Sequence, residues 1–160
     1  MNAFGRLLAA ASGGLLLFLV GPVAADTAAP YPGTEVLKTA YGFSDLRGRL
    51  ETSVEKNGMF VVTAASASAG AKARGLTIPG NIVIGVYRND FAVRMLEASV
   101  PAGIEAPLRF YLTENADGTS TLTYRKPSAV FAPYGSSKLD AMAKELDGIW
   151  AKIVGDAIGP

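Results

Sequence analysis

The 160-residue sequence contains neither histidine nor cysteine, and this limits the chemistry that the chain can perform. Nucleophilic sites of the Ser-His-Asp or Cys-His type are excluded, because each needs one of these two residues. Zinc sites built from His and Cys are excluded for the same reason, and haem ligation by His or Cys is not expected. Acidic residues do not follow the spacing of a calcium loop. We therefore predict no catalytic residues, no metal site and no cofactor, while an enzyme that uses Tyr, Arg, Lys or carboxylate groups stays an alternative.

Two arginines and a tyrosine form the first candidate ligand-binding group. Arg109 and Tyr111 lie two positions apart and so share one face of a predicted strand, and Arg125 lies on the matching face of the next strand. The forked donor set of arginine suits a carboxylate or a phosphate, and tyrosine adds a ring and a hydroxyl group. The alternative interpretation is a solvated sheet face with ordinary cross-strand pairs.

The second candidate group is the run Tyr87, Arg88, Asn89 and Asp90, between an apolar strand and a helix. Strand ends beside helix N-termini are common places for small anions to bind in α/β domains. Alternatively, Asn89 or Asp90 only caps the helix. Both groups are therefore predicted as ligand-binding residues, each with a purely structural alternative.

The strands that must position these groups are visible in the hydrophobic pattern. Strands are predicted at residues 35–41, 59–64 and 81–87, and a hairpin joins 108–114 to 119–126 through the turn at 115–118. The run 81–87 is apolar on both sides, which indicates a strand that is covered on both faces or lies centrally in the sheet.

Helices are predicted between these strands and at the end of the chain. The first is capped by Ser44 and ends before Gly58, and a short alanine-rich helix covers residues 66–74. A third follows Asn89 or Asp90, and the last begins near Ser136 and carries an apolar stripe that includes Trp150. Residues 128–134 are expected to form a loop or a single turn. The order β-α-β-α-β-α-β-β-α predicts an α+β fold, a two-layer α/β sandwich with a mixed β-sheet.

Residues 1–25 have the features of a cleavable signal peptide, with Arg6 followed by an apolar stretch and small residues before the cut. Cleavage is predicted between Ala25 and Asp26. The apolar stretch is too short for a permanent anchor helix. We expect a flexible lead at residues 26–34, a single domain at 35–160 and a periplasmic or secreted location, with no stable membrane anchor after cleavage.

The exported part of the chain is formally neutral, because removal of Arg6 leaves 14 basic and 14 acidic residues. These charges are interspersed, so no basic stripe is available to neutralise phosphates along a nucleic acid. The sequence also lacks a basic amphipathic helix of the kind that binds to a membrane surface. Nucleic acid is therefore not expected as a partner.

Several short strings between Tyr41 and Tyr134 carry a family resemblance. They are Ala69-Gly70-Ala71-Lys72 with Gly75-Leu76 and Pro79, the strand from Ile82 to Asn89, the positions Met95, Ala98 and Pro101, the strand start Ala106-Pro107-Leu108-Arg109, the turn from Glu114 to Gly118, and Leu122-Thr123-Tyr124 with Lys126-Pro127. In order and spacing they resemble the DUF 302 family, a domain of unknown function. The resemblance implies a small α/β sandwich without an established activity.

The sequence departs from that family pattern at one place. Many members carry an Asp-His pair just before the Ala-Gly-Ala-Lys-like string, and Ser66 and Ala67 occupy those positions here. Any metal binding or acid-base role of that pair would be lost in this chain.

Three functional hypotheses follow from the sequence. The first is a non-catalytic exported module that binds a small ligand or an envelope protein at one of the two candidate groups. The second is the enzyme described above. The third is a structural subunit that buries an apolar patch in a homodimer.

Overall fold

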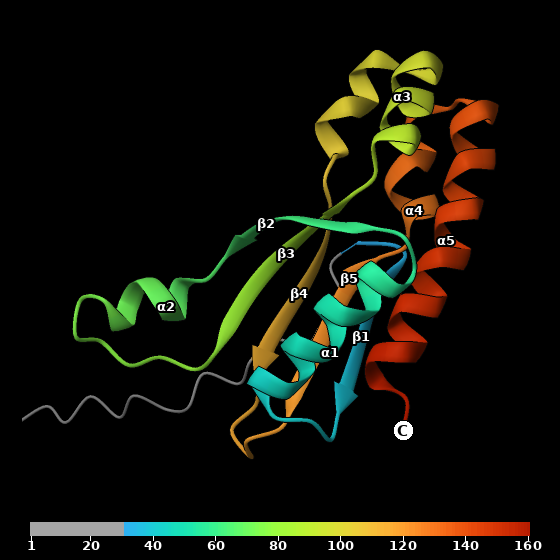
Figure 1. The fold of residues 1–160 in the computed structure, drawn as a ribbon. Helices are drawn as coiled ribbons and strands as arrows, with labels where there is room; N and C mark the ends of the chain where they lie inside the picture. Colours follow the sequence, from blue (N-terminus) through green and yellow to red (C-terminus); the bar gives the residue numbers. More distant parts are fainter. Residues whose placement is uncertain (1–30) are drawn as a thin grey trace, which may run out of the picture.

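The computed structural model describes residues 31–160, whose elements follow the predicted order with three short helices added (Figure 1). The signal peptide predicted at 1–25 and residues 26–30 of the predicted lead lie outside the described residues. The strands are β1 (Thr34–Thr39), β2 (Phe60–Ala65), β3 (Asn81–Tyr87), β4 (Leu108–Glu114) and β5 (Ser120–Arg125). The helices are α1 (Phe43–Lys56), α2 (Ala67–Lys72), α3 (Asn89–Ala98), η1 (Val100–Glu105), α4 (Pro127–Phe131), η2 (Ala132–Tyr134) and α5 (Ser137–Ile158).

The five strands form one sheet in the order β1-β5-β4-β3-β2, and every neighbouring pair is antiparallel. The two-layer α/β fold is confirmed, but the mixed sheet was expected and is wrong. The reason lies in the connections. Of the helices between strands, only α1 spans the sheet, carrying the chain from edge strand β1 to the opposite edge β2 (Figure 1). The α2 and α3 segments turn back at the sheet ends, so the strands that they join run in opposite directions.

Helices α1 and α5 pack on one face of the sheet and bury its apolar side chains (Figure 1). Leu46, Leu50 and Val54 of α1 are spaced four residues apart, so they lie on one helix face, and all three are fully buried. The two helices are joined by a buried hydrogen bond from Ser53 Oγ to the carbonyl oxygen of Ile153, at 2.8 Å. Helices α1 and α5 therefore contact each other directly as well as packing on the sheet.

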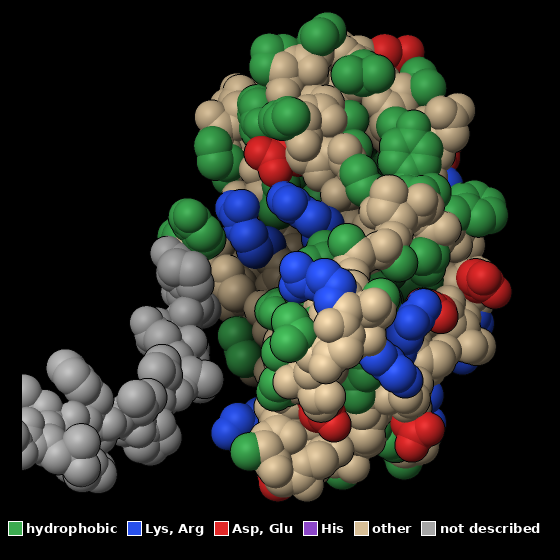
Figure 2. Space-filling model, turned by 90° about the vertical axis from the view of Figure 1, so that its left-hand side faces the viewer, with side chains coloured by type: hydrophobic (Ala, Val, Ile, Leu, Met, Phe, Trp, Pro, Cys, Tyr) green, Lys and Arg blue, Asp and Glu red, His purple; other side chains and the backbone are tan. Residues whose placement is uncertain are grey.

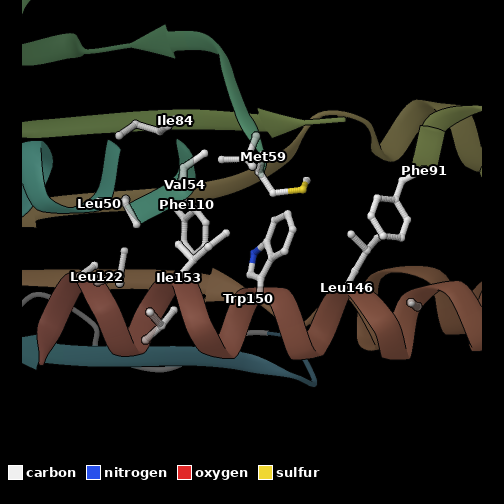
Figure 3. Close-up of a cluster of buried hydrophobic side chains, with 14 of the residues drawn as sticks. Leu50, Val54, Met59, Ile84, Phe91, Phe110, Leu122, Leu146, Trp150 and Ile153 are labelled. Carbon is white, nitrogen blue, oxygen red and sulfur yellow. The ribbon is translucent and has the colours of Figure 1, made fainter. Parts of the chain in front are cut away.

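Trp150 of α5 lies at the centre of the core, as its place on the apolar stripe predicted (Figure 3). Its ring stacks on Phe110 of β4 with 5.5 Å between the ring centroids. Phe110 also contacts Tyr124 of β5, again with 5.5 Å between the centroids. These three rings join the last helix to the central strand β4 and its neighbour β5.

The predicted bounds of β3 and β4 are confirmed, whereas two predicted helix caps are wrong. Helix α1 is capped by Gly42 rather than Ser44. It starts earlier because the Phe43 ring lies against Gly80, whose missing side chain leaves room for it. The N-cap position of α3 is Arg88, which makes no side-chain capping bond, rather than Asn89 or Asp90. The Asp90 carboxylate pairs with Arg88. In residues 31–160, no helix is long and apolar enough to cross a membrane.

Phe110→Ala should destabilise the domain by about 3–5 kcal/mol, because it removes a fully buried ring from the stack with Trp150. Chemical denaturation followed by the fluorescence of this single tryptophan measures the change. Phe60→Ala is the matched control, since the Phe60 side chain is 60% exposed. That control should change the free energy of unfolding by about 0.5 kcal/mol or less. Equal losses in the two variants would contradict the assignment of the core.

Candidate functional site

The sheet face turned away from α1 and α5, here called the open face, carries the first candidate group. The strand registers place its side chains in two neighbouring rows. The arginine row consists of Thr63, Gly85, Arg109, Arg125 and Thr34. The tyrosine row consists of Ala65, Val83, Tyr111, Thr123 and Val36. The structure therefore brings together Arg109, Tyr111 and Arg125, as the sequence predicted from strand alternation.

A hollow of about 250 Å³ opens where the two rows meet the segments that follow β3 and β5. Figure 2 shows Lys and Arg side chains gathered around a depression on this side of the molecule. Both arginines and Tyr111 line the hollow, and Glu105 of η1 and Val130 of α4 lie at its rim. The concave shape distinguishes this part of the open face from an ordinary solvated sheet surface.

Arg125 contacts both α4 and the Tyr31 ring, yet one of its N–H donors has no hydrogen-bond acceptor in residues 31–160. Its Nη2 donates a 3.4 Å hydrogen bond to the carbonyl oxygen of Ala129, and its guanidinium carbon lies 5.3 Å from the centroid of the Tyr31 ring. Its Nε is buried and finds no hydrogen-bond partner in residues 31–160, and the same is true of Thr34 Oγ1. Both unpartnered atoms belong to residues that line the hollow.

Arg109 is the second cation of the hollow. Continuing the register of β4 and β5 by one residue from Phe110 and Tyr124 places it opposite Arg125. Within the described part of the chain, its side chain forms neither an ion pair nor a hydrogen bond. Arg109 is an exposed residue, so its side chain is accessible from solvent.

Glu105 supplies the one carboxylate that lines the hollow, and Tyr134 of η2 contacts it. The Tyr134 hydroxyl donates a 2.9 Å hydrogen bond to Glu105 Oε1. This bond, together with desolvation and the charge of Glu105, raises the pKa of Tyr134. Two guanidinium groups and one carboxylate give the hollow a formal net charge of +1.

Gly85 allows close packing in the arginine row because it has no side chain. A Cβ atom at this position would overlap the Thr63 hydroxyl and would lie 2.8 Å from Pro107 Cγ. The absent side chain lets Thr63 and Pro107 pack over β3 and cover its open face. Gly85 is therefore buried on the open face, whereas Val83 on the same face is half-buried and lines the hollow.

The second candidate group directly follows β3, near the arginine row, but it does not line the hollow. Tyr87 and Arg88 instead line a separate, mainly apolar cavity beside Phe91 and Trp150. Arg88 pairs with Asp90 through two contacts, Nε to Oδ1 at 2.7 Å and Nη2 to Oδ2 at 3.0 Å. The Arg88 hydrogen bond lowers the pKa of Asp90. The Arg88 guanidinium also lies over the Phe91 ring, 4.3 Å from its centroid. Tyr87 and Asn89 make one long contact of 3.5 Å between the hydroxyl and Oδ1. This group neutralises its own charges, so the open face is the better anion site.

Other carboxyl groups form contacts away from the hollow. Arg94 of α3 forms a two-point ion pair with Glu145 of α5, at 2.8 Å and 2.7 Å, and it lowers the pKa of Glu145. Asp147 accepts a hydrogen bond from the Ser128 amide at 2.9 Å and so helps to start α4. Over residues 31–160, no cluster of three or more acidic side chains is arranged to hold a metal ion.

The comparisons with known proteins concern family and fold. The family model described as "Domain of unknown function DUF302" matches residues 35–155. The chain belongs to this family. A solved structure, "Crystal structure of uncharacterized conserved protein DUF302 from Bacillus stearothermophilus", aligns with this DUF302 domain at a TM-score of 0.70. It is 18% identical, and the alignment covers 79% of this chain and 98% of that one. A comparison with curated proteins found no match.

The positions at which a DUF302 Asp-His pair was expected lie at the start of α2. Ser66 caps this helix, and its hydroxyl oxygen accepts a 3.1 Å hydrogen bond from the Ala69 amide. Ser66 and Ala67 also line a second hollow that includes Val83 and Tyr111. The substituted pair therefore lies beside the tyrosine row and not in the arginine row.

Sequence reasoning did not identify Thr34 and Glu105 as residues that line the hollow. Thr34 was assigned to the lead, although it continues the alternation of Val36 and Lys38 one step towards the N-terminus. Glu105 lies in η1, a helix that no pattern in the sequence predicted. Only the fold brings η1 to the rim of the hollow.

The Tyr134–Glu105 contact can be tested by titration. The phenol of Tyr134 should ionise above its ordinary pKa of 10.0, and Glu105→Gln should bring that pKa closer to the ordinary value. A raised folded-state pKa stabilises the fold below pH 10.0, and this contribution is lost as the pH rises through the raised value. Ultraviolet absorbance of the phenolate, with Tyr134→Phe to assign the signal, measures the shift. An unchanged ionisation of Tyr134 in Glu105→Gln would show that the contact is absent in solution.

Proposed function

We propose that this DUF302 domain is a non-catalytic binding module that holds a small anionic ligand in the open-face hollow. The observation that carries the proposal is the buried Nε of Arg125, which has no partner in residues 31–160 and belongs to a residue that lines the hollow with a second arginine. A carboxylate or phosphate oxygen is the acceptor that such a donor lacks.

Energetics favour a ligand at this place. A buried polar group without a hydrogen bond costs about 1–3 kcal/mol. An anion that accepts from Arg125 Nε recovers this cost and gains the charge-assisted part of the bond. Thr34 Oγ1 is a second buried polar atom that the same ligand can satisfy, because a hydroxyl group both donates and accepts.

The dimensions of the hollow favour a small ligand. Its volume of about 250 Å³ lies just below the usual range of roughly 300–1,000 Å³ for small-molecule sites. Tyr111 is 41% exposed, so the ligand can also contact its side chain. With the export signal predicted at residues 1–25, the proposed place of action is the periplasm or the cell exterior.

Binding of phosphate and of acetate, measured by isothermal titration calorimetry, tests the proposal. Arg109→Gln and Arg125→Gln should each weaken binding by about tenfold to a hundredfold, since a hydrogen bond to a charged group contributes about 1.5–3 kcal/mol. Arg47→Gln is the matched control, because Arg47 pairs with Glu51 on the surface of α1, far from the hollow. Absence of binding to the unmodified domain, or the same loss in Arg47→Gln, would contradict the proposal.

A further inference from the structure

The hollow continues along the tyrosine row into a second hollow. This second hollow, of about 570 Å³, is more open and is lined by residues of β2, β3, β4 and the start of α2. Val83 and Tyr111 line both hollows, so the two hollows are neighbours on the open face. The two neighbouring hollows, here together called the groove, extend across the strands from β5 towards edge strand β2.

The groove changes in chemical character along its length. The two guanidinium groups lie at the β4–β5 end, in the arginine row. Towards β2 the lining consists of Tyr111, Val83, Ala65 and Ala67, with Ser66 and Asn81 as the polar members, and no charged side chain takes part. One end therefore suits an anionic group, and the other suits an uncharged and mainly apolar body.

We propose that the ligand of this groove is a monocarboxylate with an extended apolar body, such as a medium-chain fatty acid; this inference rests on the proposed function. Its carboxylate accepts hydrogen bonds from Arg109 and Arg125, and its body lies over Tyr111 and Val83 towards Ala65. The formal net charge of +1 around the first hollow, which includes Glu105, matches one carboxylate better than a dianionic phosphate.

The distance along the groove agrees with an extended ligand. The path from Arg125 on β5 to Ala65 on β2 crosses three strand spacings, or about 14 Å at roughly 4.8 Å each. The first hollow alone is too small to hold a long chain in a folded form, whereas the row of small and apolar side chains allows it to lie flat.

Titration with octanoate, acetate and octanol, followed by NMR chemical shifts, tests the inference. Each methylene that the groove covers completely strengthens binding about fourfold, so octanoate should bind at least about tenfold more tightly than acetate. Arg109→Gln should weaken acetate and octanoate by the same factor. Octanol lacks the charge and should bind more weakly than octanoate.

The apolar end has its own variant. Ala65→Asp places a negative charge at the β2 end of the groove, on an exposed edge strand, and should weaken octanoate while leaving acetate unchanged. Ala116→Asp makes the same change in the exposed β4–β5 turn and should leave both ligands unaffected. These two variants separate a local effect from a general effect of charge.

The possible failures are distinguishable. Equal affinities for octanoate and acetate, both reduced in Arg109→Gln, would overturn the extended ligand and leave the anion site in place. No binding of octanoate, acetate or phosphate would overturn the proposed function as well. Octanol binding as tight as octanoate, and unchanged in Arg109→Gln, would overturn the assignment of the carboxylate to the arginines.

Discussion

Successive side chains of a β-strand point to opposite faces of its sheet, and in this domain only one face is covered by α1 and α5. Ile84, Phe110 and Leu122 lie on the covered face and are fully buried. Arg109, Tyr111 and Arg125 alternate with residues of this kind along β4 and β5 and therefore face the other way. The packing that stabilises the fold thus also fixes the direction of the residues proposed to bind the ligand.

The proposed site is concave because segments outside the sheet close one end of the open face. Helices η1 and α4 bring Glu105 and Val130 to the rim, and the backbone of α4 holds Arg125 through the Ala129 carbonyl group. This contact and the Tyr31 ring position the Arg125 guanidinium before any ligand arrives. Because the side chain is already ordered, binding costs less conformational entropy than it would for a mobile arginine.

Strand alternation and helical periodicity were sufficient to predict most elements and the first candidate group. The bounds of β3 and β4 could be predicted from local pattern, because the hydrophobic face of each strand is uniform. The early start of α1 could not be predicted in this way, because Phe43 packs against Gly80, which belongs to another segment of the chain. The pairing of β1 with β5 could not be predicted from local pattern either, because it joins strands far apart in the sequence. This pairing places Thr34 beside Arg125.

The NMR resonance of the Arg125 Nε–Hε group, assigned with Arg125→Gln, tests the central claim most directly. During a titration with acetate it should shift, and the shift should saturate at the same concentration as the backbone resonances around the hollow. The Nε–Hε resonances of Arg47 and Arg88, whose Nε atoms already have carboxylate partners, should stay in place. An Arg125 resonance that does not move while acetate binds elsewhere would contradict an anion site on the open face.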